Sequence, residues 1–151
     1  MISGYRLKNL ASEVFTPFDQ HLVSGTSVDV TLGSKFWVQN SSFVNEPIDL
    51  SCIPSEDELY TLMTYDTFEL KPKQFVKAQT AEKFTMPNNA VGMFSLRSAI
   101  AQAGLEQSTS VWVRPSWAGH LILELTNLTE RTLLLREGLR IGQVHFFDAE
   151  G

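Results

Sequence analysis

Short alternations of apolar and polar residues run along most of this chain. Residues 28–32 read VDVTL, which is the period of a strand with one buried face. A turn is predicted at Gly33-Ser34, before a second extended stretch at 35–39. The same pattern predicts strands at 67–70, 75–80, 90–94, 110–114, 121–126, 132–136 and 141–147. So many short strands at close spacing indicate a mainly β sandwich or barrel.

Two short helices are predicted between these strands. Ser55 and Glu58 have the S-x-x-E spacing of a capping box, which favours a helix over 55–62. The stretch SAIAQA at 98–103 is rich in alanine and is followed by Gly104, which favours a second helix. No repeat, low-complexity run or flexible linker divides the chain, so we expect one domain over residues 1–151.

The strand at 120–127, HLILELTN, carries a carboxylate in an unusual place. Its three leucines share one face, so Glu124 lies on the opposite face beside Ile122. Such a residue is either a solvated outer-face carboxylate or a group held in a cleft for chemistry. The alternation alone leaves both interpretations open.

Composition and charge exclude several classes of function. The net charge of −5 and the pI near 5.1 argue against a nucleic-acid-binding face, and no nucleic-acid partner is predicted. The single cysteine, Cys52, rules out an internal disulfide and a cysteine-based zinc site, and we expect its thiol to be buried. The three histidines, at 21, 120 and 145, lack ligand spacing, so no metal site is predicted.

The N-terminus lacks the apolar core of a secretory signal, and no stretch of about 18 apolar residues occurs. We therefore expect no membrane association. The expected location is the cytoplasm, or the host cytoplasm if the gene is viral.

The stretch Ser95 to Ile100, SLRSAI, holds candidate anion-binding groups. Arg97 and Ser98 would place a guanidinium and a hydroxyl at the start of the second helix, which suits a phosphate. The competing interpretation is a serine that caps its own helix beside a surface arginine. Trp112 and Trp117 are likewise either packing residues or base-stacking platforms.

Taken in order, these pieces resemble the trimeric dUTPase-like superfamily and, within it, the dCTP deaminases. Residues 24–36 resemble the S-x-D-x-x-L-G segment, and residues 91–105 resemble the phosphate motif G-R-S-S-L-A-R-x-G-L. Residues 114–120 are similar to the I-D-P-G-[WFY]-x-G turn, and residues 123–127 to L-E-x-x-N. Residues 137–144 are similar to P-G-M-x-I-x-Q-L.

The resemblance implies a dUTPase-like distorted jelly-roll or β-barrel and a homotrimer with sites between subunits. It implies zinc-free hydrolytic deamination of dCTP, or a related deoxycytidine nucleotide, to the deoxyuridine nucleotide. Glu124 would be the general base, and Ser98 would also be catalytic. Mg²⁺ would enter the site bound to the nucleotide phosphates, and the reaction would use no zinc. The residues implied to bind substrate are Arg97, Ser98, Gln102, Val111, Arg114, Trp117 and Gln143.

Several positions depart from the family pattern. Ala99 replaces the second serine, and Gln102 replaces an arginine that the family places near the reacting base. The turn with Arg114 is one residue shorter and lacks the aspartate that contacts the sugar, and the chain ends at Gly151 before the family's C-terminal arm. These losses leave three alternatives open: a nucleotide-binding trimer that acts as sensor or sink, a dUTP diphosphatase, or a purely structural trimer.

Overall fold

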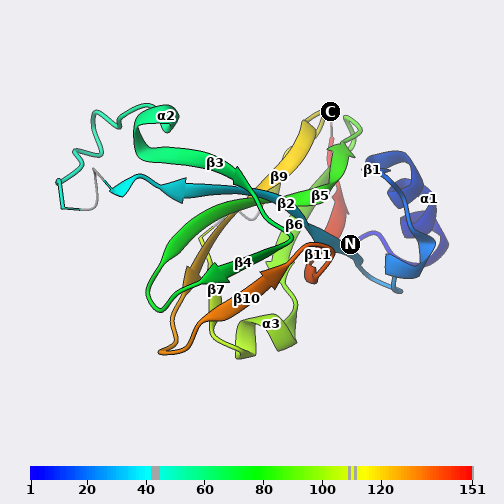
Figure 1. Cartoon of the computed structure of the whole chain (residues 1–151). Coiled ribbons are helices and arrows are strands. Elements are labelled where there is room, and N and C mark those ends of the chain that lie inside the picture. Colours follow the sequence, from blue (N-terminus) through cyan, green and yellow to red (C-terminus); the bar gives the residue numbers. More distant parts are fainter. Residues whose placement is uncertain (42–44, 109, 111, 151) are drawn as a thin grey trace.

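The structure, a computed structural model, describes residues 1–41, 45–108, 110 and 112–150 (Figure 1). Four short helical segments and eleven strands occur in these residues. The helical segments are α1 (Gly4–Val14), a 3₁₀ turn η1 (Gln20–Leu22), α2 (Glu56–Leu59) and α3 (Ser98–Gln102). The strands are β1 (Phe15–Thr16), β2 (Val28–Gln39), β3 (Tyr60–Thr64), β4 (Thr67–Leu70), β5 (Phe75–Thr85), β6 (Ala90–Leu96), β7 (Leu105–Gln107), β8 (Trp112–Val113), β9 (Ala118–Asn127), β10 (Leu133–Arg136) and β11 (Arg140–Asp148).

One curled antiparallel sheet forms most of the fold. Its main path runs β7-β9-β5-β2-β11-β6-β8, with β1 also paired to β5 and β3 also paired to β2. A separate pair, β10 and β4, is also antiparallel. In Figure 1, α1 lies at one end of the sheet, and α2 lies at the tip of the arm formed by β2 and β3. This topology confirms the predicted mainly β fold class.

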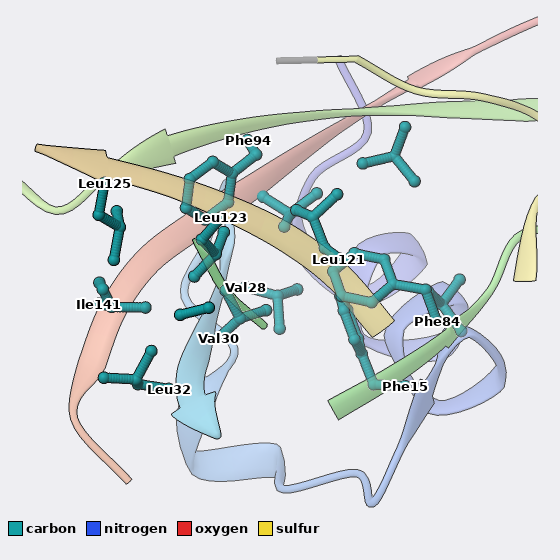
Figure 2. Packing of buried hydrophobic residues seen from close by; sticks show 14 of the residues in the cluster. Phe15, Val28, Val30, Leu32, Phe84, Phe94, Leu121, Leu123, Leu125 and Ile141 are labelled. Atoms are coloured by element: carbon teal, nitrogen blue, oxygen red, sulfur yellow. The ribbon is translucent and has the colours of Figure 1, made fainter. Parts of the chain in front are cut away.

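Alternation along the strands builds the core. Leu121, Leu123 and Leu125 of β9 are buried, and their side chains meet those of Val28, Val30 and other strand residues inside the curl of the sheet (Figure 2). Burial of apolar surface is the main stabilising contribution of such a core, and each Å² removed from water contributes about 25 cal/mol. The remaining residues of each strand lie on the opposite face, called the outer face below, and the candidate site residues of β9 and β11 lie there.

Most predicted strands are confirmed, but one predicted turn is wrong. Residues 28–39 form the single strand β2, which continues through Gly33-Ser34. The pairing of β2 with β5 shifts register between Leu32 and Phe36, so Gly33 belongs to an irregularity within the strand. The backbone there approaches β5 so closely that a Cβ on Gly33 would lie 3.1 Å from the carbonyl oxygen of Gln79. Glycine permits that approach.

The helix predictions are confirmed in part. The Ser55 hydroxyl caps α2 by accepting from the Glu58 backbone N–H at 3.4 Å, but the helix ends at Leu59 and β3 begins at Tyr60. The helix predicted at 98–103 is α3. Helix α1 was not predicted, although it buries Leu7, Ala11 and Val14. The predicted strand at 110–114 contains only β8, Trp112–Val113, among the described residues.

Cys52 is exposed, so the expectation of a buried thiol is wrong. It lies in the connection between β2 and α2, where Leu50 and Ile53 are exposed too. Among the described residues, no helix has the length and apolar character needed to cross a membrane.

Candidate active site

Glu124 lies in the middle of β9 on the outer face. Its neighbours Leu123 and Leu125 are fully buried on the other face, whereas Glu124 itself is half-buried. Its backbone carbonyl accepts a hydrogen bond from the N–H of Ser108 at 2.8 Å, and its register partner on β5 is Lys77. The strand therefore fixes the direction of this carboxylate, as the alternation predicted.

Arg97 and Ser98 lie where β6 passes into α3. Arg97 is the residue that precedes the helix, and it makes no side-chain capping hydrogen bond. The Ser98 hydroxyl accepts from the Gln102 side-chain amide at 3.2 Å, one helical turn away. The interpretation of Ser98 as a cap of its own helix is therefore wrong, because Ser98 already belongs to the helix and its hydroxyl pairs with Gln102.

A polar row crosses the outer face of β2, β11 and β6. Gln143 of β11 pairs in register with Asp29 on one side and Ser95 on the other. Its side-chain amide lies 3.5 Å from the Ser95 hydroxyl. The Asp29 carboxylate lies 3.7 Å from the Arg97 guanidinium and 3.8 Å from that of Arg140. The structure thus brings Arg97 and Gln143, both implied to bind substrate, to neighbouring positions.

Asp29 and Arg140 were not predicted as site residues. Both belong to quoted family segments, but their meeting depends on the pairing of β2 with β11, which sequence spacing does not reveal. The carboxylate of Asp29 carries a charge opposite to both guanidinium groups and so holds them near one point. The site's cationic groups are therefore preorganised by an acidic residue.

Arg114 and Trp117 border a small cavity of about 270 Å³ together with Trp112, Val113 and Leu121. Trp117 packs edge-to-face on the buried Phe84, with ring centroids 6.0 Å apart, so its packing interpretation is supported. Trp112 is 53% exposed and contacts Phe147, with ring centroids 6.3 Å apart. The predicted residue Val111 lies outside the described residues.

The predicted residues form separate groups within one chain. Arg97, Ser98, Gln102 and Gln143 gather around the end of β6, Arg114 and Trp117 border the small cavity, and Glu124 lies on β9. Three strands, β5, β2 and β11, separate β9 from β6 along the sheet path. Glu124 and Arg97 do not line any of the five main cavities of the described residues.

The described residues offer no cluster of metal-binding side chains. No group of three histidine, cysteine, aspartate or glutamate side chains gathers closely enough there to hold a metal ion. Asp29 is flanked by Arg97 and Arg140, so its carboxylate already has cationic neighbours. These donors do not fit a metal held by protein side chains alone.

Comparison with known proteins identifies the relatives of this chain. The family model described as dCTP deaminase-like matches residues 1–149. A protein named dCTP deaminase, dUMP-forming, from Corynebacterium efficiens is 36% identical over 135 residues, which cover 87% of this chain and 68% of the relative. Proteins of the same name from Methanospirillum hungatei and Mycobacterium tuberculosis are 31% and 34% identical, and the matches cover 72% and 68% of those relatives.

Solved structures show the same fold. A 2'-deoxycytidine 5'-triphosphate deaminase from Agrobacterium tumefaciens superposes with a TM-score of 0.74 at 17% identity, over 96% of this chain. This chain spans just under half of that protein, since the match covers 47% of it. The native EIAV dUTPase superposes with a TM-score of 0.50 at 18% identity, over 61% of this chain and 76% of its own.

Proposed function

The chain belongs to the dCTP deaminase-like family, and we propose that it deaminates dCTP or a closely related deoxycytidine nucleotide. Relatives that are 31–36% identical carry the name dCTP deaminase, dUMP-forming. On that basis the product is a deoxyuridine nucleotide, with dUMP the first candidate. Such an enzyme belongs to pyrimidine deoxynucleotide metabolism, and we place it in the cytoplasm.

The observation that carries this proposal is the placement of Glu124. The residue is half-buried on the outer face of β9, between strands that fix its direction. Deamination requires water to add to C4 of cytosine, which forms a C–O bond while a base takes the proton. A carboxylate takes that proton and passes it to the ring nitrogen N3. The carboxylate then moves the remaining proton of the C4 hydroxyl to the amino group, so that collapse of the adduct forms the C4 carbonyl, breaks the C4–N bond and releases ammonia.

The phosphate chain is assigned to the polar row around β6. Arg97 supplies a guanidinium, Ser98 a hydroxyl and Gln143 a side-chain amide, and these groups suit phosphate oxygens. In this assignment the Ser98 hydroxyl donates to a phosphate oxygen while it accepts from the Gln102 side-chain amide. Mg²⁺ would arrive on the triphosphate, where phosphate oxygens and water supply its ligands.

We further propose a homotrimer whose active sites lie between subunits. The support is the separation of Glu124 from Arg97 and Ser98 within one chain, by three intervening strands. A neighbouring copy that presented its own β6 end to β9 would bring both groups to one nucleotide. Closed cyclic symmetry would then create three equivalent sites.

A nucleotide panel tests the proposed reaction. The purified protein is incubated with dCTP, dCMP and modified deoxycytidine nucleotides plus Mg²⁺, while ammonia release is followed and products are identified. We expect turnover of dCTP, and a loss of roughly 10²–10⁴-fold in kcat for Glu124→Gln with nucleotide binding retained. Absence of turnover with every nucleotide would contradict the proposal. Tight binding without product, unchanged in Glu124→Ala, would instead support a sensor or sink.

A further inference from the structure

Helix α3, which carries Ser98, cannot hold its position by its own burial. It has five residues, none of which is fully buried, and only Ile100 packs against the core from a partly exposed position. Helices this short are unstable in isolation, because most helical stability in proteins comes from packing. The ends of α3 must therefore fix its position. At its start, the Arg97 backbone N–H donates to the Ile141 carbonyl of β11 at 3.1 Å.

The other end of α3 contacts the connection between β9 and β10, residues 128–132. The Gly104 carbonyl accepts from the Leu128 backbone N–H at 3.0 Å. Gly104 has a φ of 99°, and a Cβ at this position would collide with the methyl group of Thr129. Glycine therefore permits the close contact between the end of α3 and this connection.

Asn127, the last residue of β9, fixes the shape of this connection. Its side chain is fully buried, and its Nδ2 donates to the carbonyl oxygens of Leu70 at 3.0 Å and Arg131 at 2.7 Å. Its Oδ1 accepts from the backbone N–H of Thr129 at 2.8 Å and lies 2.8 Å from the Thr129 hydroxyl, which is also 3.0 Å from the Arg131 carbonyl oxygen. A buried amide with partners on both its oxygen and its nitrogen has a defined orientation. Asn127 thus holds Thr129 against Gly104.

We infer that Asn127 is a positioning residue that fixes α3 through Thr129 and Gly104. The inference rests on the proposed function in its last step, in which Arg97 and Ser98 hold the phosphate chain of the nucleotide. Hydrogen bonds to phosphate oxygens weaken steeply when their distance and angle change, so a displaced α3 would weaken both contacts together. The expected consequence is weaker nucleotide binding, with the rate of the chemical step little changed.

Amide hydrogen exchange tests whether the connection fixes α3. Thr129→Val removes the hydroxyl that contacts Asn127 and keeps the methyl group that packs on Gly104. We expect exchange at the backbone N–H groups of Ala101 and Gly104 to become roughly tenfold faster, while exchange in α1 is unchanged. Thr132→Val, the same substitution at an exposed position of the same connection, should exchange as the wild type does. Wild-type exchange in α3, or equal acceleration in α1, would overturn the inference.

Kinetics with dCTP separate positioning from a general loss of stability. We expect KM to rise roughly tenfold in Thr129→Val, with kcat within about twofold of the wild type. Inhibition by inorganic tripolyphosphate should weaken by the same factor, because this probe binds only the phosphate groups' contacts. A merely structural role would lower the fraction of active protein, so kcat would fall at unchanged KM, and that result would also overturn the inference.

Asn127→Ala should have larger effects than Thr129→Val in both assays, because it removes every side-chain contact of the buried amide. If Asn127→Ala does not fold, Thr129→Val decides. If the wild type deaminates nothing, the proposed function fails, while exchange in α3 still decides whether Asn127 positions this helix.

Discussion

Glu82 shows how a single buried carboxylate can complete an irregular pairing. It is 5% exposed and accepts from the Thr31 backbone N–H at 2.7 Å and from the Thr31 hydroxyl at 2.6 Å. Thr31 precedes Leu32, the first residue of β2 that pairs in register with β5, and the carboxylate of Glu82 on β5 accepts from the backbone N–H of Thr31 in place of a strand carbonyl. A buried polar group requires such a partner, and here a side chain provides it.

We predict that Glu82→Ala destabilises the fold by about 1.5–3 kcal/mol, because it leaves the Thr31 N–H without its acceptor. Glu82→Gln should cost less, since its amide oxygen can accept one bond and the Thr31 hydroxyl can turn to accept the other. Urea unfolding of both variants measures the difference in free energy. Glu13→Ala, on the exposed face of α1, is the control and should change stability by no more than about 0.5 kcal/mol. Equal losses in all three would contradict this role of Glu82.

At the scale of elements, α1 is tied to the sheet by burial and by an ion pair. Leu7, Ala11 and Val14 are fully buried, and Arg6 donates to the Asp148 carboxylate of β11, with Nη1 3.1 Å from Oδ2. The hydrogen bond from Arg6 lowers the pKa of Asp148 below its ordinary value. A lowered folded-state pKa means that this stabilisation is present above the unfolded pKa and disappears as pH falls through the folded one.

We therefore predict a pH-dependent difference in Tm between the wild type and Asp148→Asn. The wild type should melt slightly higher above about pH 4, the ordinary pKa of an aspartate. The difference should vanish under more acidic conditions, because the carboxyl group is then protonated in both states. The effect is small since the pair is exposed. Arg6→Gln should reproduce the same profile, and a difference that persists unchanged at low pH would assign it to packing instead.

The strands were largely predictable because period-two alternation directly reports one buried face. The three leucines of the strand at 120–127 predicted the face on which Glu124 lies. The S-x-x-E spacing predicted that Ser55 caps a helix. The sequence did not predict that β2 continues through Gly33-Ser34, because this pair fits either a turn or an irregular strand. The pairing with β5 determines which of the two forms. Helix α1 was not predicted either, because its three buried residues, Leu7, Ala11 and Val14, give only a weak helical periodicity of apolar positions.

Individual candidate residues could be named from the sequence, but their arrangement in space could not. Arg97, Ser98 and Glu124 were recognised from motifs whose order resembles a family. The convergence of Asp29, Arg97 and Arg140 depends on the order β2-β11-β6, which local spacing does not encode. The pairing of Lys77 with Glu124 depends likewise on the register between β5 and β9.

For the whole molecule, the placement of the two halves of the proposed site on different strands makes a quantitative prediction. If Glu124 and Ser98 at one nucleotide come from different subunits, then Glu124→Gln and Ser98→Ala damage different halves of each shared site. A mixed trimer contains intact sites wherever a subunit with normal Glu124 meets one with normal Ser98. Such sites have no counterpart in either parent trimer.

Unfolding and refolding the two variants together in equal amounts should therefore restore activity. Random assembly gives about one quarter of sites with both halves intact, so we expect about a quarter of wild-type kcat per site from two parents of low activity. Refolded single variants are the controls for recovery, and sedimentation checks that the mixture is trimeric. If both residues of a site came from one chain, every site would carry a lesion, and the mixture would show only the average of its parents. That outcome would place the active site within a single subunit and remove the reason for requiring a trimer.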